Sequence, residues 1–198
     1  MRTTSQAIKA YAEALPEGAT LSARELLHLG ERAAVDQALS RLVRRGELLR
    51  VRRGLFALPM KTRFGSRAPS VEAVVEHIAK STGERVSQSG ASAANLLGIS
   101  TQNPSRQVFW TSGPSRHLKL GAQSVELKHV PSWQLRAPNS RAGHAFRALA
   151  YFGKSEAAQA LRRIKATLNE EEQRELLSLR ASAPTWMAKE LSALAPSQ

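Results

Sequence analysis

One stretch of the chain changes the spacing of its apolar residues while its charge stays strongly positive. Residues 41–58, RLVRRGELLRVRRGLFAL, contain six arginines and one glutamate. Before Gly46 the apolar residues recur at helical spacing, and after it they alternate as they would along a strand. A disordered basic tail needs no such spacing. The stretch therefore predicts a helix followed by a β-hairpin, with the apolar residues buried and the arginines outside.

The residues before this stretch predict more short helices. Thr3 or Thr4 can cap a first helix, and Ser22 with Glu25 three residues later has the pattern of a capping box for a second. A third helix is expected over residues 31–45, where the apolar residues form one stripe. Three short helices followed by a hairpin, within about sixty residues, are the order of a winged helix-turn-helix.

The rest of the chain predicts a different kind of domain. Strand patterns at 107–112, 117–121 and 124–130 suggest an antiparallel meander. Helical patterns resume at Arg141, and the segment after Asn169 has a second capping box. The expected fold class is therefore α+β. The chain should have a winged-helix domain at 1–59, a linker at 60–69 that could also contact a phosphate, and a mixed domain at 70–198. The mixed domain should contain a sheet at about 106–130 and a helical bundle at about 141–195.

The charge of the chain favours an anionic partner. It has 29 Lys and Arg residues against 16 Asp and Glu, a formal net charge of +13. Such an excess attracts nucleic acid by releasing condensed counterions. A basic protein without a nucleic-acid partner, or one that binds an acidic protein, is the alternative. No apolar run approaches the ~20 residues that span a bilayer, and the first residues lack a secretion signal, so we expect a cytoplasmic protein without membrane contact.

Enzyme chemistry finds little support in the sequence. The chain has no cysteine, and its only aspartate, Asp36, lies on the third expected helix. The five histidines have unrelated spacings, which favours surface or core roles over metal binding. The acidic run at 170–172 suits a helix N-terminus. We therefore expect no catalytic residues, metal or cofactor.

The expected DNA-binding residues lie on the third helix and the hairpin. Packing of the apolar stripe leaves Gln37, Arg41 and Arg44 on one outer stripe, where Gln can read adenine and Arg guanine in the major groove. The hairpin arginines suit phosphates or a narrow minor groove. An amphipathic helix also needs a solvated face, which arginine can supply without any DNA. The candidate residues are Arg32, Gln37 and Arg41 for bases, together with Ser40, Arg44, Arg45, Arg50, Arg52 and Arg53.

The second domain carries basic residues of its own. They suit an acidic partner protein, a further stretch of DNA backbone or a solvated surface, and the sequence leaves these three open. The three tryptophans are expected to anchor the core or a domain interface rather than to stack on bases. The basic residues are Arg106, Arg116, Lys119, Lys128, Arg136, Arg141 and Arg147.

Three segments of the chain resemble a known family. They are AVDQALSRLVRRGELLRVRRGLFALP in the first domain, and SGASAANLLGIS and WTSGPSRHLKLGAQSVELKHVP in the second. They resemble the AbiEi-like antitoxins of bacterial type IV toxin-antitoxin systems, and the resemblance runs to about Pro131. It implies an autorepressor that binds inverted repeats in its own promoter and counters a nucleotidyltransferase-like toxin without a stable complex. The family pattern maps onto Gln37, Arg41, Arg44, Arg52 and Arg53.

We therefore expect a sequence-specific, double-stranded-DNA-binding transcriptional regulator. An RNA-binding accessory protein and a basic protein-interaction module are the alternatives. Sequence and salt dependence of binding separate these classes, because specific DNA readout predicts a promoter footprint whereas RNA binding predicts retention of transcripts.

Overall fold

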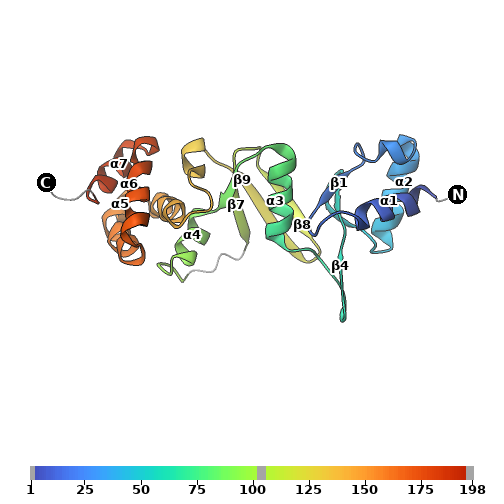
Figure 1. Cartoon of the computed structure of the whole chain (residues 1–198), viewed down its shortest axis with the longest axis horizontal. Coiled ribbons are helices and arrows are strands. Elements are labelled where there is room, and N and C mark those ends of the chain that lie inside the picture. The colour runs from blue at the N-terminus through green and yellow to red at the C-terminus, as the bar shows by residue number, and fades with distance from the viewer. Residues whose placement is uncertain (1–2, 102–105, 195–198) are drawn as a thin grey trace. The chain divides into compact units, whose positions relative to one another are not determined.

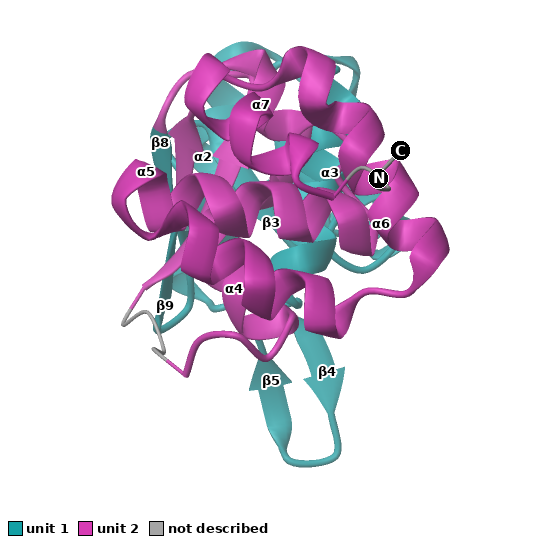
Figure 2. Cartoon of the chain, turned by 90° about the vertical axis from the view of Figure 1, so that its left-hand side faces the viewer, with its two compact units in different colours: residues 1–84, 116–125 teal, residues 85–115, 126–198 magenta. Residues whose placement is uncertain are grey.

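The computed structural model describes residues 3–101 and 106–194. It shows an α+β protein that combines helices with several small antiparallel sheets (Figure 1). The chain divides into two compact units, coloured separately in Figure 2. Unit 1 comprises residues 1–84 and 116–125, and unit 2 comprises residues 85–115 and 126–198.

Helix α1 (Thr4–Glu13) opens unit 1 with the expected cap. The Thr3 hydroxyl accepts a hydrogen bond from the Gln6 backbone N–H at 3.3 Å, and the Gln6 side chain accepts one from the Thr3 N–H at 2.9 Å. This reciprocal pair satisfies two N–H groups that the helix itself cannot. Ile8 and Ala12 are buried on its inner face.

The expected second α-helix was wrong. The bonds of the capping box do form, with the Glu25 carboxylate accepting from the Ser22 N–H at 2.8 Å. Ser22, however, is the last residue of strand β1 (Thr20–Ser22), and the chain after it makes turns and one short 3-10 helix, η1 (Leu27–Leu29). Nucleating an α-helix is unfavourable, and the few residues between the strand and Gly30 form too few helical hydrogen bonds to compensate for it.

The predicted helix and hairpin of residues 31–58 are confirmed. Helix α2 (Arg32–Arg44) is followed by strands β2 (Leu49–Arg52) and β3 (Leu55–Ala57), which pair antiparallel. Gly54 in their turn has φ +74°, a conformation that L side chains rarely adopt. Strand β3 also pairs with β1, so the sheet order is β1-β3-β2. The buried core shared by these elements is Ile8, Leu21, Leu26, Val35, Leu39, Leu42, Leu48 and Phe56.

The stretch expected to be a linker is instead a second hairpin. Strands β4 (Met60–Thr62) and β5 (Gly65–Arg67) pair antiparallel and project from the rest of unit 1 (Figures 1 and 2). Three-residue strands of polar residues carry no apolar alternation by which to predict them. Helix α3 (Val71–Thr82) follows, and the Ser70 hydroxyl caps it by accepting from the Ala73 N–H at 3.2 Å. It belongs to unit 1, where His77 Nδ1 accepts a hydrogen bond from the Thr20 N–H at 3.1 Å.

The larger sheet contains the three predicted strands in a different order. Its order is β6-β7-β9-β8, so β9 lies between β7 and β8, and the expected meander was wrong. Strand β6 pairs with β7, with Ser87 opposite Trp110, and was not predicted. A strand's partner is a long-range property that local patterns do not encode. The strands are β6 (Val86–Gln88), β7 (Gln107–Thr111), β8 (Arg116–Leu120) and β9 (Gln123–His129).

Helices dominate unit 2. The longest, α5 (Arg141–Thr167), is interrupted at Gly153, where φ is +73° and ψ 179°, so it consists of two helical segments. The second capping box, between Asn169 and Glu172, is also confirmed. Among the described residues, none of the helices is both long and apolar enough to cross a membrane. The other helices are α4 (Gly90–Leu96), η2 (Ser132–Leu135), α6 (Glu170–Ser178), η3 (Leu179–Ser182) and α7 (Thr185–Ser192).

Candidate nucleic-acid interface

Helix α2 presents one polar face to solvent. Burial of its apolar stripe turns the opposite positions outward. Gln37, Arg41 and Arg44 are exposed on that side, and Ser40 between them is half-buried. The side chains that the sequence predicts for a groove-reading helix therefore share one accessible surface.

Two of the predicted arginines near this face have acidic neighbours. The Nε of Arg32 donates to the Asp36 carboxylate at 2.9 Å, an exposed pair one helical turn apart. Arg45, the C-cap residue, lies 4.0 Å from the Glu47 carboxylate. By contrast, no carboxylate of the described residues lies within 4.0 Å of the guanidinium groups of Arg41 and Arg44.

The first hairpin carries three more exposed arginines. Arg50 and Arg52 lie on β2, and Arg53 lies in the turn. The Arg50 guanidinium is 5.7 Å from the centroid of the Phe56 ring, a cation–π distance. Along residues 3–101 and 106–194 none of these three arginines is ion-paired. Their full charge is available to an external anion.

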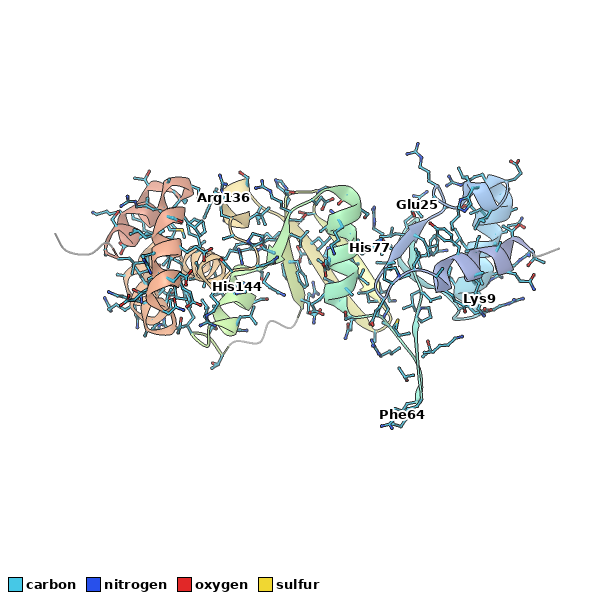
Figure 3. The ribbon with its side chains drawn as sticks, viewed as in Figure 1. Lys9, Glu25, Phe64, His77, Arg136 and His144 are labelled. Atoms are coloured by element: carbon cyan, nitrogen blue, oxygen red, sulfur yellow. The ribbon has the colours of Figure 1, made fainter. Side chains whose placement is uncertain are left out.

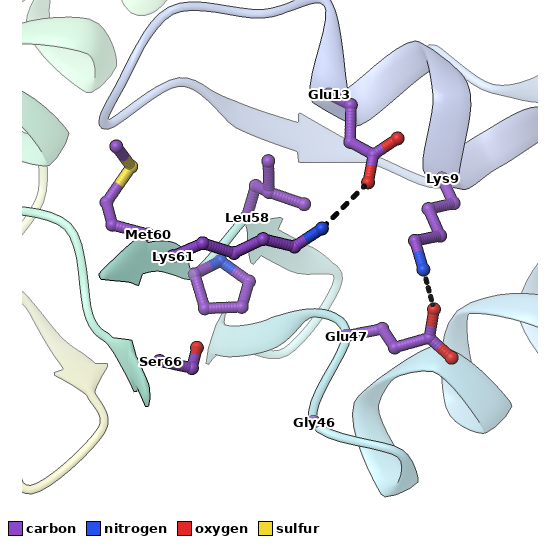
Figure 4. A pocket seen from close by; sticks show the side chains of 9 residues that line it. Lys9, Glu13, Gly46, Glu47, Leu58, Met60, Lys61 and Ser66 are labelled. Atoms are coloured by element: carbon purple, nitrogen blue, oxygen red, sulfur yellow. Dashed lines mark hydrogen bonds and ion pairs between the residues drawn. The ribbon is translucent and has the colours of Figure 1, made fainter. Parts of the chain in front are cut away.

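Two lysines of the same unit are also ion-paired. Lys9 on α1 donates to the Glu47 carboxylate at 2.5 Å, and Lys61 lies 3.8 Å from Glu13 (Figure 4). The hydrogen bond raises the pKa of Lys9 and lowers the pKa of Glu47. These residues line a cavity of about 470 Å³. The pair also fixes the turn from α2 into β2, because Glu47 directly follows the Gly46 that ends the helix.

The Lys9–Glu47 pair stands at the end of a groove between α1 and α2. The groove is lined by polar residues of α1 and by Gln37 and Arg41 of α2. These two candidate residues therefore lie next to the capped N-terminal turn of α1 around Thr3, Ser5 and Gln6. Backbone N–H groups at such a turn are a common phosphate contact in DNA complexes.

The sequence suggested a phosphate contact somewhere in residues 60–69 but did not single out any residue of the second hairpin. Arg63 and Phe64 form its tip, and both are exposed. One signal was present in the sequence: no acidic residue occurs between Glu47 and Glu72. That run of one charge sign covers both hairpins.

The basic residues assigned to the second domain are not one surface. Arg147 is completely buried in unit 2 and donates to the carbonyl oxygens of Arg136 at 3.0 Å and Pro138 at 2.8 Å. Burial lowers the pKa of Arg147 to about 10. Arg141 is paired with Glu172 at 3.1 Å. Arg116, which belongs to unit 1, is largely buried against Glu84 at 2.7 Å, while Arg106, Lys119, Lys128 and Arg136 are exposed.

The histidines take part in local hydrogen bonds. The ring Nδ1 of His28 lies 2.8 Å from the Glu25 carbonyl oxygen, and that of His129 lies 2.9 Å from the Gly113 carbonyl oxygen. Over the part of the chain that the structure describes, no three His, Cys, Asp or Glu side chains come together as metal ligands would.

Comparison with known proteins places the chain in a family. No curated protein matches it. The crystal structure of the RV2827C protein from Mycobacterium tuberculosis is similar in fold, with a TM-score of 0.52 and 18% identity over 98% of this chain and 77% of that one. A family model matches residues 7–176. The chain therefore belongs to DUF6088, a family of unknown function.

Proposed function

We propose that the chain is a transcriptional regulator that binds double-stranded DNA through α2 and the β2–β3 hairpin. The observation that carries this proposal is the set of exposed arginines on these two consecutive elements that have no carboxylate partner within the described part of the chain. Because a solvated surface usually mixes charges of both signs, such a set favours an external polyanion. The set comprises Arg41, Arg44, Arg50, Arg52 and Arg53.

The order of elements supports a winged helix-turn-helix. The series α1, β1, η1, α2, β2, β3 has this order, with η1 in the place of a second helix. Helix α2 has 13 residues, so it is ~20 Å long at 1.5 Å per residue. The major groove, about 12 Å wide, admits one α-helix. The hairpin then lies beside the groove, along the backbone.

The ion pairs suggest how the candidate residues divide the contacts. Gln37 and Arg41 are free to reach base edges, with Ser40 beside them, and Arg44 with the hairpin arginines faces phosphates. Arg32 must break its ion pair with Asp36 before it can contact DNA. We therefore assign it a smaller contribution to the binding free energy than the sequence suggests. The Glu47 carboxylate competes with DNA for Arg45 in the same way, so the contribution of Arg45 is also smaller.

The family resemblance extends the proposal to a biological role. An AbiEi-like antitoxin would repress its own operon at inverted repeats and oppose a nucleotidyltransferase-like toxin without binding it stably. The neighbouring gene tests this part. If it encodes such a toxin, co-expression of the full chain should restore growth of cells that express the toxin. Toxicity that persists with the chain present would contradict the antitoxin role and leave the DNA-binding proposal standing.

A promoter footprint tests the DNA-binding function. The purified full chain should protect two symmetric half-sites upstream of its own gene from DNase I, at concentrations that do not protect an unrelated fragment. A double variant, Arg41→Ala with Arg44→Ala, should lose that protection while its far-UV circular dichroism stays unchanged. Preferential retention of transcripts over promoter DNA would favour the RNA-binding alternative. Binding to neither nucleic acid would favour an acidic protein partner.

A further inference from the structure

The tip of the β4–β5 hairpin exposes a large aromatic side chain. Phe64 is 86% exposed and lies at the far end of the hairpin (Figure 3). Two-residue hairpin turns are usually built from Asn, Asp or Gly, whose backbones suit the turn. A phenylalanine here buries almost no surface and so adds little to the stability of the fold. Its presence calls for a partner outside unit 1.

The turn fixes the backbone that carries this side chain. Thr62 Oγ1 donates to the Gly65 carbonyl oxygen at 2.9 Å and accepts from the Phe64 N–H at 3.2 Å. Gly65 has φ +118°, which a residue with a side chain rarely adopts. A tip fixed by its own backbone loses little conformational entropy when it binds.

The base of the hairpin is tied to the rest of unit 1. Arg67 lies 3.3 Å from the Glu17 carboxylate, which also accepts from the Ser70 N–H at 3.3 Å. On the other strand, Lys61 lies 3.8 Å from Glu13. The hairpin is therefore anchored at its base by acidic residues, and these acids are absent from its tip.

The tip combines an aromatic ring with an unpaired cation. The Arg63 guanidinium lies 4.6 Å from the centroid of the Phe64 ring, and no carboxylate of the described residues is within 4.0 Å of it. A flat ring with a flat cation matches the chemistry of nucleic acid, which offers stacked bases between phosphates. A membrane surface fits less well, because stable insertion needs several apolar side chains.

We propose that the β4–β5 hairpin is a second DNA-contacting element, which enters the minor groove and wedges Phe64 between base pairs while Arg63 contacts the groove. This inference rests on the proposed DNA-binding function. Three residues per strand give a reach of ~10 Å, and the minor groove is about 7.5 Å deep. The tip can therefore reach the base edges, and the unstacking that it causes bends the duplex.

A set of single substitutions in the full chain tests this proposal. The probe is a promoter duplex of roughly 30 base pairs with donor and acceptor dyes at its ends, so that bending raises energy transfer. Phe64→Ser should weaken binding about 5–10-fold and remove the bend, while the salt dependence stays unchanged because no charge is lost. Phe64→Leu keeps an apolar wedge and should retain most of the bend. Leu96→Ser, at a 57% exposed site in unit 2, is the matched control and should behave as the parent does.

The outcomes separate this proposal from the function on which it rests. If the parent binds the duplex and Phe64→Ser binds and bends it equally well, the hairpin inference is wrong and the DNA-binding function stands. If the parent does not bind the duplex, the proposed function itself fails. Sedimentation with vesicles of anionic phospholipid supplies a further test. Vesicle binding that Phe64→Ser abolishes, without any change in DNA binding, would assign the tip to a membrane and overturn the proposal.

Discussion

Two groups of arginines in this protein play opposite roles. In unit 1 the guanidinium groups of Arg41, Arg44 and the first hairpin are exposed, and no carboxylate of the residues that the structure describes pairs with them. In unit 2 Arg147 is completely buried and uses its two terminal nitrogens to bind backbone carbonyl oxygens. The first group is available to a partner, and the second is part of the core.

The difference shows that charge counts alone do not locate a binding surface. Both kinds of arginine contribute equally to the net charge of +13. Only burial and local partners distinguish a cation that an external anion can reach from one that organises a loop. Arg147 binds the irregular segment between η2 and α5, which contains Arg136 and Pro138. The following predictions test this contrast.

The largest expected effect concerns the buried arginine. Arg147→Met keeps an apolar stem but removes the donors to two partly buried carbonyl groups, which should lower the free energy of unfolding of unit 2 by about 2–5 kcal/mol. All three tryptophans lie in unit 2, so their fluorescence during urea denaturation reports on that unit. Arg136→Met, at an exposed position, is the control and should change the value by less than about 0.5 kcal/mol. Equal stability of the two variants would mean that Arg147 has no such role.

The exposed arginines should affect DNA binding and leave stability alone. Arg41→Ala should weaken specific binding by about 1–3 kcal/mol, because a base contact is lost, and Arg53→Ala should weaken specific and non-specific binding alike. Fluorescence anisotropy with promoter and random duplexes measures both. Arg162→Ala removes the same charge from an exposed site on α5 and is the control. An equal loss for Arg162→Ala would show that only net charge matters.

A smaller effect, a gain in DNA affinity, is expected when the acidic partner of a paired arginine is removed. Asp36→Asn removes the carboxylate that holds Arg32 and also removes a negative charge from the proposed interface. Affinity for random duplex DNA should rise about threefold, with a steeper salt dependence. Glu76→Gln, which breaks the Lys80 pair on α3, is the matched control. Tighter binding by the control alone would contradict the assignment of α2.

The smallest effect concerns pH and unit 2. Burial, with the charges of Arg147 and Arg141 nearby, lowers the pKa of His144 below its usual 6.5. The His144 imidazole is therefore protonated more readily in the unfolded chain than in the folded one. The stability of the fold that depends on a neutral His144 is fully present above pH 6.5 and is lost as the pH falls through the lowered pKa. Between pH 7 and 5 the melting temperature should fall less in His144→Gln than in the parent, by about 2 °C or less. A larger fall of the melting temperature in His144→Gln than in the parent would contradict a lowered pKa of His144.

Local patterns in the sequence predicted the elements with a strong periodicity or a cap. Helix α2 and the first hairpin follow from the change of apolar spacing at Gly46, and the caps at Thr3, Ser70 and Asn169 follow from side-chain chemistry. Such signals depend on a few neighbouring residues and survive in any tertiary context. The solvent-exposed face of α2 follows from the same periodicity.

Features set by distant residues were not predictable in this way. The order of the four-stranded sheet and the pairing of β6 depend on partners far along the chain. The β4–β5 hairpin lacks apolar alternation, and the cap at Ser22 competes with a strand that ends there. Arg147 had one available signal, since all residues from 142 to 150 other than His144 and Arg147 itself are apolar or small, as is typical of a buried helix.

The salt dependence of DNA binding tests the central claim most directly. The affinity of the full chain for its promoter duplex can be measured between 50 and 200 mM KCl, for the parent and for a variant in which Arg41, Arg44, Arg52 and Arg53 are all alanine. Each lost phosphate contact reduces the slope of log affinity against log salt by ~0.9. Arg44, Arg52 and Arg53 are the phosphate contacts among the four, so we predict a slope shallower by about 2–3 in the variant, with no loss of folded structure. An unchanged slope in a folded variant would contradict the assignment of these arginines to DNA.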